Sequence, residues 1–213
     1  MSLVATAGQL SHDVYDPIPK GRFLKTYRIG ETVCATAIID GIFWIANQGT
    51  ELEENGEFSI DGWGADFDAF PIYHSILGNL HSGFDKNLPT LVKALLLDIP
   101  YGMPVINTGH SKGGGEGGPL AARLKIAGVN VLPPVLFASP NSGYQRFADW
   151  LAENLPGGLS YRNGIDCVPE VPIEPFVPPY QHIGMHQPPG GIKDMIPTCW
   201  HDMQLYLQGA LAL

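Results

Sequence analysis

The sequence predicts an α/β fold with a mostly parallel central sheet, helices on both faces and an N-terminal antiparallel hairpin. From residue 81 onward, short apolar strands alternate with stretches of helical spacing, which is the pattern of βαβ units. Nearer the N-terminus, two β-branched runs flank Asp40-Gly41, a dipeptide typical of two-residue hairpin turns. The 213 residues suffice for one domain with a substantial core, and we expect a single domain spanning 1–213.

The first half of the chain predicts a helix, a hairpin and a second helix. Residues 3–14 favour a short helix, which the proline-rich stretch 17–21 ends. Residues 32–39 and 42–47 are rich in β-branched and apolar residues and form the strands of the hairpin. Residues 88–96 place apolar side chains three or four positions apart, which predicts a helix.

The second half alternates strands with helices. The predicted elements are a strand at 105–107, a helix ending near Gly128, a strand at 131–138, a helix at 143–154, a strand at 159–162 and a helix at 199–211. Two segments, 51–80 and 168–198, lack this periodicity. Loops of such length tend to be functional, so we expect both segments to be substrate-site loops or lids.

The turn after the strand at 105–107 reads Gly109-His110-Ser111-Lys112-Gly113. It matches the G-x-S-x-G pattern of a nucleophile elbow, in which a strained turn raises a serine hydroxyl above the sheet edge. Glycines two positions before and after the serine let strand and helix approach closely. The pattern also occurs by chance, so a plain glycine-rich connection is the structural alternative.

Nucleotide binding is a competing interpretation of the same stretch. Gly113, Gly115 and Gly118 form G-x-G-x-x-G, which requires an acidic residue about 20 positions later to hold a ribose. No Asp or Glu occurs between Glu116 and Asp149. A phosphate-binding loop requires Gly-Lys-Ser/Thr, whereas the order here is Ser-Lys-Gly. Both nucleotide patterns are therefore set aside.

A serine at neutral pH needs a base to take its proton and a carboxylate to orient that base. In a parallel sheet these groups come from loops at the carboxyl ends of strands. Asp166 follows the strand at 159–162, and His201 stands at the start of the last helix. The order Ser111, Asp166, His201 is that of α/β-hydrolases, and these three are the predicted catalytic residues.

Other acids and histidines fit less well. His182, in proline-rich surroundings, is the main competitor for the base. Asp149 lies inside a helix, while Asp194 and Asp202 are too close to His201 in sequence to come from a separate strand end. The remaining histidines lack the strand context or the position that a base requires: His12, His74, His81, His110 and His186.

The composition of the chain limits the classes of partner that we expect. A net charge of −9 argues against nucleic acid or an anionic membrane surface as a partner. No stretch is long and apolar enough for an integral membrane segment, and no signal peptide is visible, so we expect a cytoplasmic protein. The three cysteines lack metal-binding spacing. Three reduced thiols are the simpler interpretation, with a Cys167–Cys199 bridge as the alternative.

Five segments, in family order, resemble the class 3 lipase family of α/β-hydrolases. They are Ile-Phe-Trp-Ile-Ala-Asn-Gln-Gly-Thr-Glu at 42–51, His-Ser-Gly-Phe at 81–84, Gly-His-Ser-Lys-Gly-Gly at 109–114, Phe-Ala-Ser-Pro-Asn-Ser-Gly at 137–143, and 162–169 together with 180–184. His201, followed by a helix that contains a tyrosine, resembles the late histidine of the family.

The resemblance implies the α/β-hydrolase fold and lipase or esterase chemistry on small-molecule or lipid esters, with no metal or other cofactor. It also implies an oxyanion hole formed by Thr50 and the backbone N–H of Lys112. The chain departs from the family at Gln48 (usually Arg), at Lys112 (usually apolar) and in the glycine-rich stretch 113–119. With the short chain, these departures resemble bacterial or phage-borne relatives.

Apolar residues of the two unperiodic segments are candidates for the acyl site. On one side these are Trp63, Phe70 and Tyr73, and on the other Phe176 and Tyr180. Ordinary core packing is the alternative for each. For the whole chain, the alternatives to ester hydrolysis are a degenerate hydrolase fold that only binds, and an acyltransferase. The oligomeric state has no signal in the sequence.

Overall fold

The computed structural model describes residues 1–16, 21–50, 70–173, 175–185 and 200–213. Strands of the main sheet are β1 (Lys25–Ile29), β2 (Thr32–Ile39), β3 (Ile42–Asn47), β6 (Val105–His110), β7 (Val135–Phe137), β8 (Leu159–Asn163) and β9 (His182–Met185). In the described part of the chain they form one seven-stranded sheet, ordered β1-β2-β3-β6-β7-β8-β9. Pairing is antiparallel from β1 to β3 and parallel from β3 to β9, which confirms the predicted fold class.

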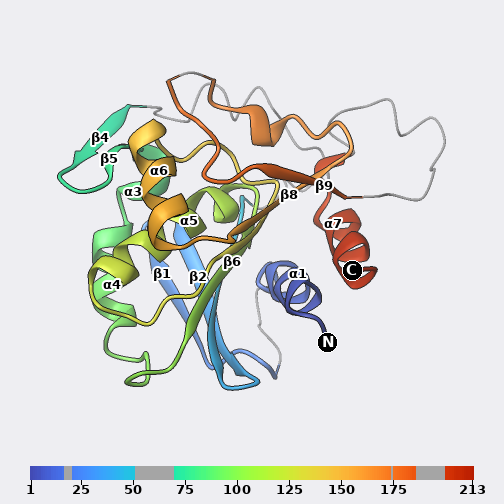
Figure 1. The fold of residues 1–213 in the computed structure, drawn as a ribbon. Helices are drawn as coiled ribbons and strands as arrows, with labels where there is room; N and C mark the ends of the chain where they lie inside the picture. The colour runs from blue at the N-terminus through green and yellow to red at the C-terminus, as the bar shows by residue number, and fades with distance from the viewer. Residues whose placement is uncertain (17–20, 51–69, 174, 186–199) are drawn as a thin grey trace.

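Helices cover both faces of this sheet (Figure 1). One face carries α3 (Ser82–Asp85), α4 (Leu88–Leu95), α5 (Lys112–Ile126) and α6 (Gln145–Asn154), and the other carries α1 (Leu3–Asp13) and α7 (Met203–Leu211). Alternate residues of β3 supply the two cores, because successive side chains of a strand point to opposite faces. Phe43 and Ile45 pack with α4 and α5, whereas Trp44 packs with α1 and α7.

The N-terminal hairpin forms as predicted. Asp40 and Gly41 both have positive φ, 52° and 75°, as a tight two-residue turn between strands requires. β1 extends the hairpin at the sheet edge and is an element that the sequence does not predict. Its only buried side chain is Tyr27, so β1 lacks the apolar alternation that marks a strand.

β7 is shorter than the strand predicted at 131–138. Pro133 and Pro134 have no N–H to donate to a neighbouring strand, so regular pairing is confined to Val135–Phe137. This short strand still lies between β6 and β8 in the sheet. The prolines therefore shorten the strand without changing the predicted topology.

Both segments predicted as loops contain described strands. β4 (Pro71–His74) and β5 (Gly78–His81) form a separate two-stranded sheet, and β9 adds an edge to the main sheet. The last helix begins at Met203 rather than at 199, because the Asp202 carboxylate caps it by accepting the N–H of Gln204. Strands of four residues are too short for their periodicity to stand out in the sequence.

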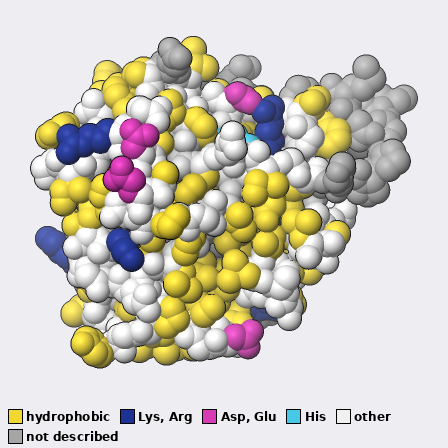
Figure 2. All heavy atoms as spheres, in the orientation of Figure 1, with side chains coloured by type: hydrophobic (Ala, Val, Ile, Leu, Met, Phe, Trp, Pro, Cys, Tyr) yellow, Lys and Arg dark blue, Asp and Glu magenta, His cyan; other side chains and the backbone are white. Residues whose placement is uncertain are grey.

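Apolar side chains cover much of the face drawn in Figure 2, and charged side chains on it are few. This agrees with the low charged fraction of the chain, 15%. Within the described ranges, no helix is both long and apolar enough to cross a membrane.

Candidate active site

Ser111 occupies the turn between β6 and α5. Its φ of 59° and ψ of −129° lie in a region that residues other than glycine rarely adopt. A Cβ at Gly109 would collide with the carbonyl of Gly113, and a Cβ at Gly113 would collide with the carbonyl of Asn47. The close approach of β3, β6 and α5 therefore requires both glycines, as the elbow pattern predicts.

The glycine-rich start of α5 is a continuous, buried helix. A Cβ at Gly115 would press against Phe84 and Pro140, and a Cβ at Gly117 would press against Leu136. The absence of side chains thus lets the first turns of α5 lie close to the sheet. The free N–H groups and the positive end of the helix dipole are held next to Ser111.

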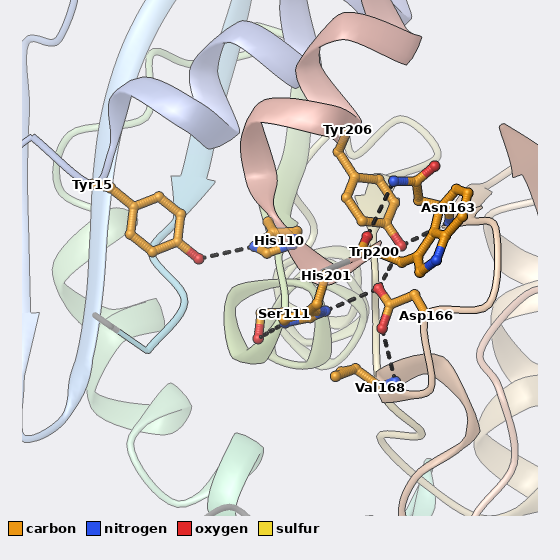
Figure 3. A network of polar contacts seen from close by, with 9 residues as sticks. All are labelled: Tyr15, His110, Ser111, Asn163, Asp166, Val168, Trp200, His201 and Tyr206. Atoms are coloured by element: carbon orange, nitrogen blue, oxygen red, sulfur yellow. Dashed lines mark hydrogen bonds and ion pairs between the residues drawn. The ribbon is translucent and has the colours of Figure 1, made fainter. Parts of the chain in front are cut away.

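The hydroxyl of Ser111, the ring of His201 and the carboxylate of Asp166 form a continuous chain of hydrogen bonds (Figure 3). Ser111 Oγ lies 2.9 Å from His201 Nε2, and His201 Nδ1 lies 2.9 Å from Asp166 Oδ2. An ionised carboxylate only accepts, so Nδ1 carries the proton and Nε2 accepts from the serine. The three residues are 2%, 5% and 0% exposed, respectively.

Hydrogen-bond donors keep the Asp166 carboxylate ionised. Burial by itself raises the pKa of this carboxyl. The hydrogen bond from His201, with those from the Tyr206 hydroxyl (2.6 Å) and the Val168 N–H (3.0 Å), outweighs burial and lowers the pKa. Both carboxylate oxygens are therefore engaged, and His201 has a fixed negative partner.

Residues next to the hydrogen-bonded Ser111, His201 and Asp166 connect the end of β8 to the segment before α7. The Tyr206 hydroxyl, which donates to Asp166, accepts the N–H of Asn163 at 2.8 Å. The Asn163 amide donates to the carbonyl of Trp200, the residue before His201, at 3.1 Å. Sequence reasoning missed Asn163 and Trp200, and its signal for Tyr206 was the tyrosine-containing helix of the family resemblance.

His110 lies against the other side of His201. Their ring centroids are 4.6 Å apart, and the Tyr15 hydroxyl lies 3.1 Å from His110 Nδ1 (Figure 3). Burial, together with the nearby His201, lowers the pKa of His110 well below its ordinary value, so His110 stays neutral. It packs against the histidine of the hydrogen-bonded chain and does not bond to Ser111 among the described contacts.

The predicted oxyanion donors lie on the two sides of the elbow. Lys112 opens α5 directly after Ser111, so its backbone N–H is one of the free donors of the first turn. Thr50 is exposed and stands three residues after the end of β3. A Cβ at the preceding Gly49 would collide with the His110 carbonyl, so this segment runs tightly against the end of β6.

Comparison with known protein families identifies the family of this chain. The sequence model of the family described as Lipase (class 3) matches residues 44–176, which is more than half of the chain. The chain belongs to the class 3 lipase family. This membership supports an ester-hydrolysing lipase function. The matched region includes Ser111 and Asp166, whereas His201 lies beyond it. A search of curated proteins found no significant match to the sequence.

Solved lipase structures share the fold of this class 3 lipase. The Rhizomucor miehei triacylglyceride lipase superposes with a TM-score of 0.69 at 19% identity, covering 86% of this chain and 78% of that one. The Aspergillus oryzae mono- and diacylglycerol lipase gives 0.69 at 15% identity, covering 88% and 81%. A triacylglycerol lipase described as having a serine protease triad as its catalytic centre gives 0.63 at 22% identity, covering 79% and 73%.

The competing base, His182, lies elsewhere in this class 3 lipase. It opens β9, and its Nδ1 lies 3.0 Å from the hydroxyl of Ser160 on the neighbouring strand β8. Burial lowers the pKa of His182. The structure therefore brings His201, and not His182, to the hydroxyl of Ser111.

The predicted acyl-site residues have different surroundings. Phe70 and Tyr73 are exposed by 71% and 67%. Phe176 is buried, with its ring against His81 and Tyr144. Packing thus accounts for Phe176, and its role toward a substrate stays a prediction.

Tyr180 also packs inside the protein. It lies against the core on the α5 side of the sheet, and its hydroxyl donates to the carbonyl of Leu155 at 3.0 Å. These contacts account for its position in the same way as for Phe176. Trp63 lies outside the described residues.

Metal binding has no candidate ligand set in the part of the chain that the structure describes. No three His, Cys, Asp or Glu side chains there are grouped to hold an ion. Cys34 is a buried free thiol. Cys167 is also a free thiol, so the alternative of a Cys167–Cys199 bridge is not formed in this structure. Cys199 itself lies outside the described ranges.

Proposed function

We propose that this class 3 lipase cleaves carboxylic esters through an acyl-enzyme on Ser111. The supporting observation is the buried chain of hydrogen bonds from Ser111 through His201 to Asp166, with 2.9 Å at each step. Such a chain lets a weakly acidic hydroxyl become a nucleophile, because the histidine accepts its proton as the new bond forms.

In the acylation step, Ser111 Oγ attacks the ester carbonyl while His201 Nε2 accepts the hydroxyl proton. The imidazolium that forms is stabilised by the Asp166 carboxylate, which remains ionised. His201 then returns the proton to the leaving alcohol as the tetrahedral intermediate collapses. In the second half, water takes the place of the alcohol, and the same residues release the acid and regenerate Ser111.

The oxyanion of each tetrahedral intermediate is held by the N–H of Lys112 and by Thr50. The strained backbone of Ser111 places Lys112 at the first turn of α5, where the helix dipole adds positive potential. Donors of this kind typically lower the barrier by about 3–4 kcal/mol each, because they are already oriented before charge develops.

The substrate is a small-molecule or lipid ester. The named relatives act on acylglycerols by their descriptions, and the exposed aromatic rings of Phe70 and Tyr73 suit an acyl chain. The proposal includes a single α/β-hydrolase domain spanning 1–213, with 51–80 and 168–198 as its substrate-site segments. Residues 51–69, 174 and 186–198 of these segments lie outside the described residues.

The test is a panel of p-nitrophenyl esters from acetate to palmitate, hydrolysed by the wild type and by Ser111→Ala. We expect hydrolysis by the wild type and a rate for Ser111→Ala lower by at least a thousandfold. Circular dichroism checks that the variant is folded. A folded Ser111→Ala protein with wild-type activity would overturn the proposal.

A further inference from the structure

A second buried carboxylate, Glu116, lies one turn along α5 from Lys112. Its side chain is 0% exposed. One oxygen, Oε1, accepts a hydrogen bond from the Thr32 hydroxyl at 2.8 Å and lies 3.2 Å from the ammonium of Lys112. The other oxygen, Oε2, has no hydrogen-bond partner among the described residues. None of these contacts involves the hydrogen-bonded chain of Ser111, His201 and Asp166.

Lys112 connects this carboxylate to a different part of the sheet. Its side chain is almost buried, and its ammonium donates to the carbonyl of Glu31 at 2.6 Å while facing Glu116 at 3.2 Å. Glu31 stands in the turn between β1 and β2, and Thr32 begins β2. The ammonium of Lys112 and the carboxylate of Glu116 therefore hold the start of α5 against the β1–β2 turn.

The same residue, Lys112, carries the backbone N–H assigned above to the oxyanion hole. A side chain anchored at its far end restricts the rotation of its own peptide unit. We propose that the buried Lys112–Glu116 pair positions this N–H, so that hydrolysis requires Glu116 to be ionised. The inference rests on the proposed function, and Glu116 acts through Lys112 as a positioning residue.

The surroundings of Glu116 bring its ionisation into the working pH range. Burial raises the pKa of Glu116 to about 7, while Lys112 and Thr32 act in the opposite direction and Glu31 adds to the rise. Among the described residues, the buried thiol of Cys34 on β2 also faces Glu116, and its pKa is itself raised by burial and by Glu116. Below about pH 7 the carboxyl gains a proton, and the ion pair becomes a weaker hydrogen bond between a charged and a neutral group.

The test is the dependence of kcat on pH for a soluble p-nitrophenyl ester at saturating concentration. The proposed mechanism uses the neutral imidazole of His201 as the base, and the inference adds the requirement that Glu116 be ionised. We therefore expect kcat to fall by more than tenfold per pH unit on the acid side.

Glu116→Gln imitates the protonated state of the carboxyl. Its kcat at pH 8 should fall roughly tenfold, less than for complete loss of an oxyanion donor, with KM within about twofold. On the acid side, the kcat of Glu116→Gln should fall only tenfold per pH unit, which is a slope of one in a plot of log kcat against pH.

Two further variants separate positioning from stability. Lys112→Met/Glu116→Gln removes both charges and should resemble Glu116→Gln. The matched control is Asp85→Asn/Arg123→Met, which removes a largely buried ion pair between α3 and α5 (2.6 Å) far from the first turn of α5. We expect this control to retain the steep acid limb even if its melting temperature changes.

A wild-type acid limb of unit slope would overturn the inference, and so would a folded Glu116→Gln with wild-type kcat and pH profile. The wild-type measurement needs no variant, so a misfolded variant leaves the inference testable. Failure of the proposed function looks different, because activity would then persist in Ser111→Ala.

Discussion

Asp166 and Glu116 are two fully buried carboxylates near the same serine, and their surroundings shift their pKa values in opposite directions. Asp166 receives donors on both oxygens, from His201, Tyr206 and Val168, and its pKa is lowered. Glu116 receives donors on one oxygen only, and its pKa is raised to about 7. Burial raises the pKa of both carboxyls, and the different number and placement of donors accounts for the opposite directions of the two net shifts.

The opposite pKa shifts of Asp166 and Glu116 agree with the different roles proposed for them. A carboxylate that orients the base must stay charged over the working pH range, and the Asp166 network ensures this. The carboxylate beside the first turn of α5 is free to titrate, and it couples the elbow to pH. The predictions that follow either break one of the two networks or measure the contrast between them.

The largest effect is expected for Asp166→Asn. An amide has an N–H₂ group that competes for the position of the acceptor, so His201 no longer holds its proton on Nδ1. We expect kcat to fall about 10⁴-fold on p-nitrophenyl butyrate, with the fold retained by circular dichroism. A loss of less than tenfold in a folded variant would remove Asp166 from the proposed mechanism.

The second prediction concerns Glu116 and stability. Its pKa in the folded state lies above its unfolded value, so the native state holds this proton to higher pH. The stability that comes from the protonated form is complete below about pH 4.5 and is lost as pH rises through about 7. Relative to Glu116→Gln, the unfolding free energy of the wild type should drop by about 3 kcal/mol from pH 4.5 to pH 8. Urea unfolding of both proteins at pH 4.5 and at pH 8 measures this change. If the wild type and Glu116→Gln differed in unfolding free energy by the same amount at both pH values, the account would be contradicted.

Gly113→Ala tests the elbow that lies between the two networks. Its new Cβ would collide with the carbonyl of Asn47, a backbone atom that moves only if β3 and α5 separate. We expect a loss of about 2 kcal/mol in unfolding free energy and a large loss of kcat. Gly184→Ala is the matched control, because no atom of the described residues lies within 4 Å of its added Cβ. Equal stabilities of the two variants would show that the close approach is not required.

Tyr206→Phe weakens the Asp166 network without removing its charge. The change deletes the donor to Asp166 and leaves the N–H of Asn163 without that acceptor, which costs about 1 kcal/mol of stability. The lowered pKa of Asp166 contributes stability at neutral pH that is lost as pH falls through the folded-state pKa. In Tyr206→Phe this loss should begin at a higher pH. Acid titration followed by fluorescence measures the shift, and an unchanged acid midpoint would count against the role of Tyr206.

The catalytic candidates could be found from sequence because each has a local signal. Ser111 stands in a five-residue pattern whose glycines have a steric reason, and Asp166 follows a recognisable strand. His201 precedes a helix at the right place in chain order. The structure brings these three residues together at hydrogen-bond distances. The sequence left His182 as a competitor, because its pairing with Ser160 depends on strand register.

The supporting residues could not be found in this way. Asn163 and Trp200 act through a contact between segments that are far apart in sequence. Asn163 lies in the family-like segment 162–169, but nothing in that segment indicates its contact with Trp200. The pairing of Lys112 with Glu116 has helical i, i+4 spacing, but its burial and its anchor at Glu31 are tertiary. Among the strands, β1 was missed because its side chains are mostly exposed, and the full extent of β7 was overestimated across two prolines.

The most direct test of the central claim is covalent labelling of the nucleophile with a p-nitrophenyl alkylphosphonate. The serine oxygen attacks phosphorus and expels p-nitrophenolate, which leaves a stable phosphonyl ester in place of the acyl-enzyme. We predict one p-nitrophenolate released per chain, loss of esterase activity in parallel, and an adduct located on Ser111 by peptide mass spectrometry, with none in Ser111→Ala. An adduct on another residue, or inactivation of the wild type without modification of Ser111, would contradict the account.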